Sequence, residues 1–256
     1  MKNQTAHRPW PVPNSPWVQF QRWEDLLFAH WQFPAAQLQA MIPPGLTLDT
    51  FDGQAWLGVV PFEITGIRWH GLPPIPGFAH FPEVNVRTYV TRDEKPGVYF
   101  FSLDAAKLWA VIGARFAYHL PYFHARMKIR REGEWIRYQS TRIHRGAPAA
   151  EFVSRYRPVG EVSTAQPGTL EHWLTERYCL YAVDQRGGVY RAEIHHAPWP
   201  LQHAELAITT NTLAQASGFN LAGSSTDQPL LHFSRRQDVL VWLPSRVKTP
   251  KIPASS

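Results

Sequence analysis

The 256-residue sequence has one cysteine, Cys179, and no long hydrophobic run. A single cysteine excludes the intramolecular disulfide framework that small secreted domains commonly need. Residues 1–14 are polar and rich in proline, so they lack the apolar core of a signal peptide. The longest apolar stretches, such as 55–62 and 108–114, are shorter than the roughly 20 residues that cross a bilayer as a helix. These features predict a cytoplasmic protein with no membrane partner.

The common catalytic and metal-binding motifs are also missing. The sequence has no G-x-S-x-G nucleophile elbow, no P-loop, no dinucleotide fingerprint, no H-E-x-x-H and no C-x-x-C. Among the 12 histidines, His195 and His196 are adjacent on a predicted strand and therefore point to opposite faces. No other histidine pair has ligand spacing in an acidic setting. We therefore expect no metal site and no cofactor.

Lysine is scarce, although the chain is basic. The 26 Lys and Arg residues outnumber the 20 Asp and Glu, which gives a net charge of +6. Only six of the basic residues are lysines, and the longest basic cluster is 128–131. Nucleic-acid-binding proteins concentrate positive charge along one face, so no nucleic-acid partner is expected. Arginine favours bidentate pairing with carboxylates and stacking on aromatic rings, which suits a pocket for an acidic ligand.

Aromatic residues make up 13% of the chain, and the 23 prolines and 16 glycines indicate short elements joined by turns. The periodicity predicts helices over 23–31, 35–42, 105–118 (with Asp104 as its N-cap) and 168–177. It predicts strands over 46–51, 55–65, 82–92, 97–103, 122–130, 135–142, 152–158, 178–184, 189–197, 205–210, 230–234 and 239–243. This is more strand than one flat sheet usually holds, so a β-dominated α+β fold with a closed sheet or two packed sheets is expected.

The sequence predicts one domain with two appendages. Residues 17–243 form the domain, since no linker or internal repeat divides them. Residues 1–16 read as an arm that drapes over the domain through Trp10 and Trp17. Residues 244–256 read as a flexible basic tail. The proline-rich loop 71–77 is long enough to form a rim or a lid.

The most informative strand spans residues 83–90. Strand side chains alternate between faces, so Glu83, Asn85, Arg87 and Tyr89 share one face and valines and Thr88 the other. Glu83 and Arg87 lie about 13 Å apart at about 3.3 Å per residue, so they cannot pair with each other. The polar face is either solvated or lines a cavity, and the alternation alone favours neither.

Two other groups of residues bear on the pocket. His124, Arg126, Lys128 and Arg130 share a face of a second strand, which favours exposure for the last two and leaves Arg126 open. Among the lysines, Lys107 stands at the start of a predicted helix beside apolar residues. Both features lower the pKa of an amine, as a Schiff-base nucleophile requires.

Several blocks of the sequence resemble the YqjF-like family of uncharacterised bacterial proteins, in the acetoacetate-decarboxylase-like superfamily. They are "IPPGLTLDTFDGQAWLGVVPF", "FPEVNVRTYV", "GVYFFSLDA", "LPYFHARM", "PGTLEHWLTERYCLY" and "IHHAPWPLQHAE". The match is collinear over roughly residues 17–243. It implies a closed or partly closed antiparallel β-barrel with a few flanking helices around an interior cavity, with the Glu83 face pointing inward.

The resemblance also implies roles for individual residues. Glu83, in "FPEVNV", is similar to a pocket glutamate of the decarboxylase. Lys107 stands in a place similar to the Schiff-base lysine, but Leu108 follows it where the decarboxylase has a second lysine.

Three functions remain in competition. In the first, the protein binds a small carboxylate- or carbonyl-bearing molecule through Glu83, Asn85 and Arg87, with the candidates Tyr89, Tyr122 and Arg126 nearby. In the second it is a Schiff-base lyase that uses Lys107, and in the third a non-catalytic interaction scaffold. A small organic ligand is the expected partner, and a homo-oligomer is compatible with the sequence.

Overall fold

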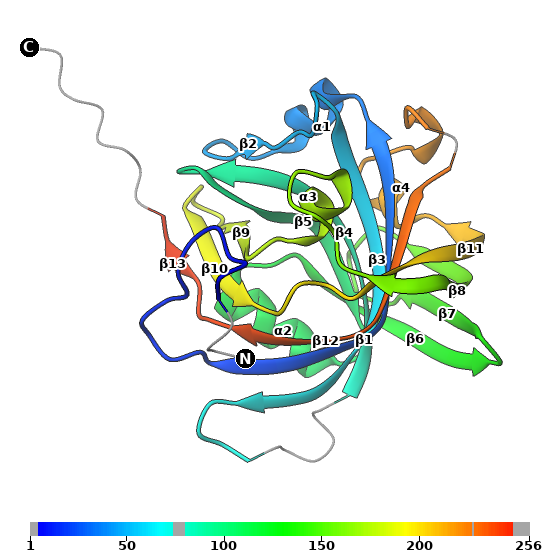
Figure 1. The fold of residues 1–256 in the computed structure, drawn as a ribbon, viewed down its shortest axis with the longest axis horizontal. Helices are drawn as coiled ribbons and strands as arrows, with labels where there is room; N and C mark the ends of the chain where they lie inside the picture. Colours follow the sequence, from blue (N-terminus) through cyan, green and yellow to red (C-terminus); the bar gives the residue numbers. More distant parts are fainter. Residues whose placement is uncertain (1–4, 74–79, 227, 248–256) are drawn as a thin grey trace, which may run out of the picture.

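The computed structural model describes residues 5–73, 80–226 and 228–247. Within these residues the chain forms a 13-stranded sheet that curls into a ring-like, partly closed shape with short helices at its edges (Figure 1). The strands are β1 (Gln19–Phe33), β2 (Thr47–Leu48), β3 (Ala55–Trp69), β4 (His80–Arg92), β5 (Lys95–Ala105), β6 (Tyr122–Glu132), β7 (Trp135–Arg142), β8 (Glu151–Ser163), β9 (Cys179–Val183), β10 (Val189–His195), β11 (Leu201–Asn211), β12 (Leu230–Val241) and β13 (Ser245–Arg246). The helices are α1 (Ala35–Met41), α2 (Leu108–Tyr118), α3 (Leu170–Thr175), α4 (Leu213–Ala216) and the 3-10 helix η1 (Leu221–Gly223).

The sheet forms two partly closed rings that share strands. Its order is β13-β10-β9-β5-β6-β7-β8-β11-β12-β1-β3-β4-β2, with additional pairings β4–β5 and β10–β12. One ring runs from β4 through β5, β6, β7, β8, β11, β12, β1 and β3. The smaller ring leaves β5 through β9 and β10 and returns through β12, β1, β3 and β4. The β-dominated, ring-like fold is as predicted, although β5 pairs in parallel with both β6 and β9.

Among the strands that belong to both rings, β1, β3 and β4 have buried side chains on both of their faces. On one face, Val59 and Val84 belong to the large apolar cluster inside the longer ring. On the other face, Val60 and Glu83 line a cavity inside the smaller ring. The same strands therefore separate a filled compartment from a hollow one.

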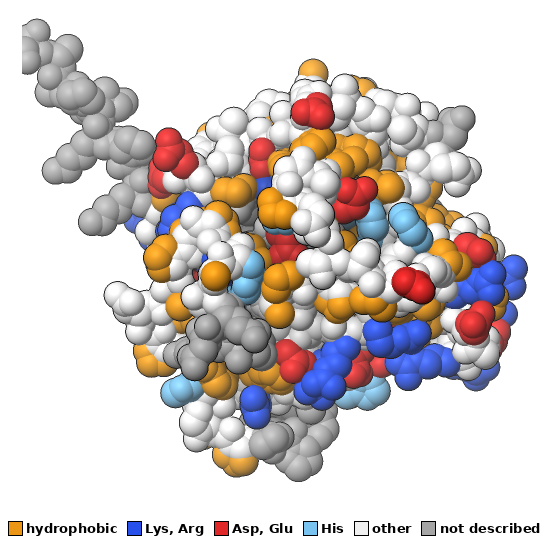
Figure 2. Space-filling view, viewed as in Figure 1, with side chains coloured by type: hydrophobic (Ala, Val, Ile, Leu, Met, Phe, Trp, Pro, Cys, Tyr) orange, Lys and Arg blue, Asp and Glu red, His pale blue; other side chains and the backbone are white. Residues whose placement is uncertain are grey.

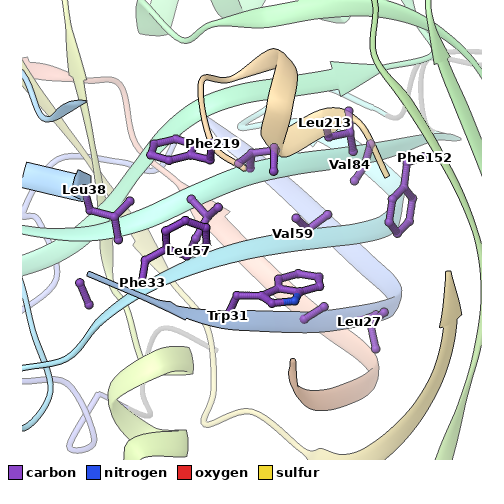
Figure 3. Close-up of a cluster of buried hydrophobic side chains, with 14 of the residues drawn as sticks. Leu27, Trp31, Phe33, Leu38, Leu57, Val59, Val84, Phe152, Leu213 and Phe219 are labelled. Carbon is purple, nitrogen blue, oxygen red and sulfur yellow. The ribbon is translucent and has the colours of Figure 1, made fainter. Parts of the chain in front are cut away.

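The filled compartment is the main hydrophobic core (Figure 3). Trp31, Leu57 and Val84 from the shared strands lie with Phe152 of β8 and Leu213 of α4. Burial of such a side chain contributes about 1.5–3 kcal/mol relative to exposure. The shared strands are thus held in place from the side that faces away from the cavity.

The predicted helix over 23–31 is wrong, because these residues lie in β1, paired with β12 and β3. Leu27 and Ala29 enter the apolar core, whereas Leu26 and Phe28 belong to a second cluster on the cavity side. A strand buried on both faces loses the polar–apolar alternation of a half-exposed strand. Its continuous apolar run therefore resembles a helix in the sequence.

Asp104 does not cap a helix. It lies in β5, fully buried, and its carboxylate accepts hydrogen bonds from the guanidinium of Arg142, with Nη2 2.7 Å from Oδ1. Helix α2 begins four residues later at Leu108, with Lys107 at the N-cap position. Pairing Asp104 with Arg142 is favoured over helix capping because each of the two buried charges then has a partner.

The described part of the N-terminal arm packs against the sheet. The side chain of Arg8 is buried, and its Nη1 donates to the carbonyl of Ile194 at 2.6 Å. Glu193 accepts from Trp10 Nε1 at 2.7 Å and also pairs with Arg8. Trp17 joins a small apolar cluster at the start of β1.

The surface view shows Lys and Arg side chains gathered toward the end of the molecule where β6, β7 and β8 lie, with acidic side chains among them (Figure 2). Arg157, for example, pairs with both Glu134 and Glu205. In the part of the chain that the structure describes, no helix has the length and apolar character needed to cross a membrane. The predicted loop 71–77 lies mostly outside the described residues, as does most of the predicted tail.

Candidate functional site

The hollow compartment of the smaller ring holds a cavity of about 130 Å³. A buried water needs about 10–15 Å³ of such space, so the cavity has room for a small organic molecule. Most of its lining is apolar, with side chains from β1, β3, β5, β9 and β10 and from α2. Its polar and charged lining residues are Gln19, Gln21, Glu83, Asn85, Arg87, Tyr118, Tyr122, Thr175, Arg177 and His196. An apolar cavity with a few converging polar groups is the usual form of a ligand site.

Glu83 is a buried carboxyl group whose proton equilibrium lies near neutral pH. Burial raises the pKa of Glu83 from 4.5 to about 7, and hydrogen bonds from Tyr122 and Asn85 oppose part of this rise. The Tyr122 hydroxyl donates to Oε2 at 2.7 Å. Burial and the neighbouring Glu83 raise the pKa of Tyr122 well above its usual value, so the phenol remains the proton donor. A carboxyl group in this setting can give or take a proton at neutral pH.

Arg87 is a buried cation without a carboxylate partner among the described residues. Its Nη2 donates to the Tyr89 hydroxyl at 3.3 Å, and its guanidinium lies 5.2 Å from the centre of the Phe28 ring. Its Nε is buried and has no hydrogen-bond partner. Buried charges are normally paired, so this arrangement leaves the guanidinium available to an anion.

A polar chain extends from Arg87 away from the cavity. The hydroxyl of Tyr89 also lies 2.6 Å from Nε2 of His30, and all three side chains are buried. Burial lowers the pKa of His30 well below its usual value, and the positive charge of Arg87 lowers it further. The imidazole is therefore neutral at physiological pH, and it orients Tyr89 without adding a second positive charge.

A second buried arginine, Arg177, lines the same cavity. Its Nη1 donates to Asp49 and its Nε donates to the carbonyl of Trp173, each at 2.6 Å. The guanidinium lies 4.8 Å from the Tyr89 ring centre and 4.3 Å from that of Trp173. Its remaining nitrogen, Nη2, is buried without a partner.

Four buried polar atoms on the cavity-lining residues lack a hydrogen-bond partner within the protein. They are Nε of Arg87, Nη2 of Arg177, Nε1 of Trp199 and Oδ1 of Asn85. Buried polar atoms are nearly always satisfied, so such a group needs an explanation. Three of the four are donors, and two of those belong to cations. The cavity therefore suits a ligand that supplies hydrogen-bond acceptors and negative charge.

The structure brings four of the predicted site residues together around the cavity: Glu83, Asn85, Arg87 and Tyr122. Tyr89 lies just behind them, in contact with Arg87. The alternation of β4 explains the grouping, because Val84 and Val86 lie on the opposite face in the core.

Two predicted site residues lie elsewhere. Arg126 is exposed on β6 and lines a separate surface depression, not the cavity. Lys107 is half-buried at the N-cap of α2 and is not among the described residues that line the cavity. Among the other described lysines, Lys95 lies beside Glu193 and Lys128 is exposed.

Sequence reasoning missed Arg177, Gln19 and Gln21. Arg177 follows the short helix α3, where no strand alternation marks an inward position. Gln19 and Gln21 lie at the start of β1, and the apolar residues that follow them in this strand were predicted to form a helix. A signal for Arg177 does exist in the block "EHWLTERYCLY", because arginine stacks on aromatic rings such as that of Trp173.

Comparison with known proteins places this fold and sequence in a family. The model of the DUF2071 family, described as an uncharacterized conserved protein, matches residues 20–238. The uncharacterized protein YqjF of Bacillus subtilis (strain 168) is 48% identical over 231 residues, which are 90% of this chain and 93% of the relative.

Solved structures of low sequence identity share the fold. The enduracididine biosynthesis enzyme MppR complexed with pyruvate superposes with a TM-score of 0.61 at 11% identity, covering 94% of this chain and 93% of that one. Acetoacetate decarboxylase from Legionella pneumophila gives 0.59 at 12% identity, covering 96% and 94%. The fold is therefore that of acetoacetate-decarboxylase-like proteins. With a family match over most of its length, the chain belongs to the DUF2071 family, and it is 48% identical to YqjF.

Proposed function

We propose that the protein binds a small organic carboxylate in the cavity, with the carboxylate on Arg87. The observation that carries this proposal is the buried, unpaired Arg87 guanidinium in the wall of a cavity. A carboxylate accepts paired hydrogen bonds from an arginine fork and neutralises its charge. Arg177 adds a second donor, since its Nη2 is also free. Because Asp49 already balances the charge of Arg177, one ligand carboxylate is enough to balance the charge of Arg87 while Glu83 is protonated.

Glu83 and Tyr122 define the other polar end of the cavity. Glu83 and Arg87 are four residues apart on β4, or about 13 Å along the strand, so a single small carboxylate group cannot contact both. A carbonyl or hydroxyl further along the ligand can accept a hydrogen bond from protonated Glu83 or from Tyr122. With its pKa at about 7, Glu83 is protonated in about half of the molecules at neutral pH. This second contact favours a ligand that carries a carbonyl or hydroxyl besides its carboxylate.

The fold supports a ligand of this class without specifying it. MppR, which shares the fold, is described in complex with pyruvate, a small carbonyl-bearing carboxylate. For a Schiff-base lyase, a lysine would have to reach the same cavity, and the described lining residues include none. A scaffold would have no need for a hollow compartment lined by buried charges. Non-covalent binding therefore fits the described site best.

Isothermal titration with pyruvate and with butyrate tests the proposal. We expect saturable binding to the wild type, and at least about 30-fold weaker binding to Arg87→Met, because loss of one partner of a buried charge pair costs at least about 2 kcal/mol. Arg87→Lys keeps the charge and should lose less. Arg130→Met removes an exposed arginine of β6 and should bind like the wild type. Equal affinity in the wild type and a folded Arg87→Met, or no binding of either acid, would overturn the proposal.

A further inference from the structure

A groove of about 270 Å³ adjoins the cavity. It lies between α2 and the strands β1, β3 and β4, and its walls include Ile64, Ile67, Trp69, Phe81 and Trp109. None of its described lining residues carries a charge. Gly113 and Ala117 on α2 are exposed, so the groove opens to solvent along this helix.

The groove and the cavity share part of their lining. Gln19, Gln21, Ala114, Tyr118 and Tyr122 belong to both. These five residues therefore form a junction between the two spaces. A ligand that reaches from the cavity into the groove would pass between these residues.

The side chains along one face of β4 change from charged and polar in the cavity to apolar in the groove. On β4 the same face carries Arg87, Asn85 and Glu83 in the cavity and then Phe81 in the groove. At about 3.3 Å per residue, Arg87 and Phe81 lie about 20 Å apart along the strand. A track with a cation at one end and aromatic and aliphatic side chains at the other matches an amphiphilic molecule.

We propose that the natural ligand is a long-chain amphiphilic carboxylate, whose alkyl tail reaches past the junction so that its end lies in the groove beside α2. This inference rests on the proposed function, since it places the carboxylate on Arg87. The tail passes Glu83 and Tyr122 at the junction and buries apolar surface against Ile64 and Phe81. Such burial contributes about 0.8 kcal/mol per methylene, or up to about fourfold in affinity for each.

Gly113 offers a way to fill the groove without touching the cavity. It lines the groove only, its φ is not in the left-handed region, and a Cβ added there meets no atom within 4 Å. A phenylalanine Cβ at this position therefore meets no clash, and its ring would occupy the space of the tail in a rotamer that points into the groove. Ile112→Phe is the matched control, because Ile112 is exposed on the same helix and lines neither space.

The experiment is titration of the wild type, Gly113→Phe and Ile112→Phe with butyrate and palmitate, since an extended palmitate chain is long enough to reach from Arg87 to the groove. We expect palmitate to bind the wild type and Ile112→Phe at least about tenfold more tightly than butyrate. In Gly113→Phe, butyrate should bind as in the wild type, and palmitate should lose most of its advantage. If palmitate binds the wild type no better than butyrate, or if Gly113→Phe leaves palmitate unaffected, the groove does not hold a tail, although binding through Arg87 stands. If neither acid binds, the proposed function itself fails.

Discussion

The buried carboxyl of Glu83 should make the stability of the protein depend on pH in a window that the structure defines. Burial raises the pKa of Glu83 from 4.5 to about 7 in the folded state. The folded protein therefore keeps a proton that the unfolded chain loses between these two pH values. The free energy of unfolding should fall through this window by about 1.4 kcal/mol per pH unit. The total loss is roughly 3 kcal/mol, and it is complete above pH 7.

Glu83→Gln isolates this effect, because glutamine has nearly the same shape and never ionises. Its amide oxygen can still accept the hydrogen bond that Tyr122 donates to Glu83. At pH 5 the variant should be more stable than the wild type by less than about 1 kcal/mol, because folded Glu83 keeps its proton and the unfolded chain has only begun to lose it. At pH 9 the variant should be more stable by roughly 3 kcal/mol, because the wild type must bury a carboxylate. The measurement is urea unfolding followed by circular dichroism at a series of pH values between 4.5 and 9.

Glu161→Gln supplies the control, since Glu161 is exposed at the end of β8 and the substitution makes the same change in charge. Its stability difference from the wild type should stay near zero across the series. A difference for Glu83→Gln that does not change with pH would refute the burial argument. So would a Glu83→Gln variant that becomes less stable than the wild type as the pH rises, because that would indicate an ionised Glu83 with a stabilising partner.

Two further predictions concern residues outside the cavity. Arg142→Met leaves the Asp104 carboxylate buried and unpaired, so the free energy of unfolding measured in urea should fall by about 3–5 kcal/mol. The double variant Arg142→Met with Asp104→Leu should recover much of this loss. Equal losses in the single and the double variant would contradict the argument. Lys107 should remain unmodified when the protein is treated with borohydride in the presence of pyruvate, because Lys107 does not line the cavity. The measurement is mass spectrometry. A reduced adduct in the wild type that is absent from Lys107→Ala would contradict this prediction.

The sequence predicted through its alternation which side chains of β4 share a face. Glu83, Asn85 and Arg87 occur at every second position, and strand geometry alone puts them on one face. The alternation could not decide between solvent and cavity, because a polar face suits both. The resemblance to acetoacetate-decarboxylase-like proteins supplied that decision, and the cavity-lining position of these three side chains agrees with it.

The secondary-structure prediction was wrong where contacts with distant parts of the chain favour a different structure from the one that the local sequence pattern indicates. β1 pairs along its edges with β3 and β12, and the side chains on both of its faces enter apolar clusters, so its apolar segment has no polar alternation to reveal a strand. Asp104 stands where a helix cap is expected, but Arg142, 38 residues further along the chain, satisfies its carboxylate instead. The position of Lys107 likewise depends on where α2 begins, which the burial of Asp104 helps to set. Contacts between residues this far apart in the chain cannot be predicted from the pattern of a short sequence segment.

The division of the fold into two compartments explains how the protein remains folded although its cavity contains buried charged groups. Buried Glu83 and unpaired Arg87 both lower the stability of the folded state. The strand that carries them is held from its opposite face, where Val84 and Val86 are fully packed in the main core. Changes on the cavity face can therefore alter binding without removing the contacts that hold β4 in the sheet. The same separation lets a ligand neutralise Arg87 and increase stability on binding, as any ligand that binds only the folded state must do.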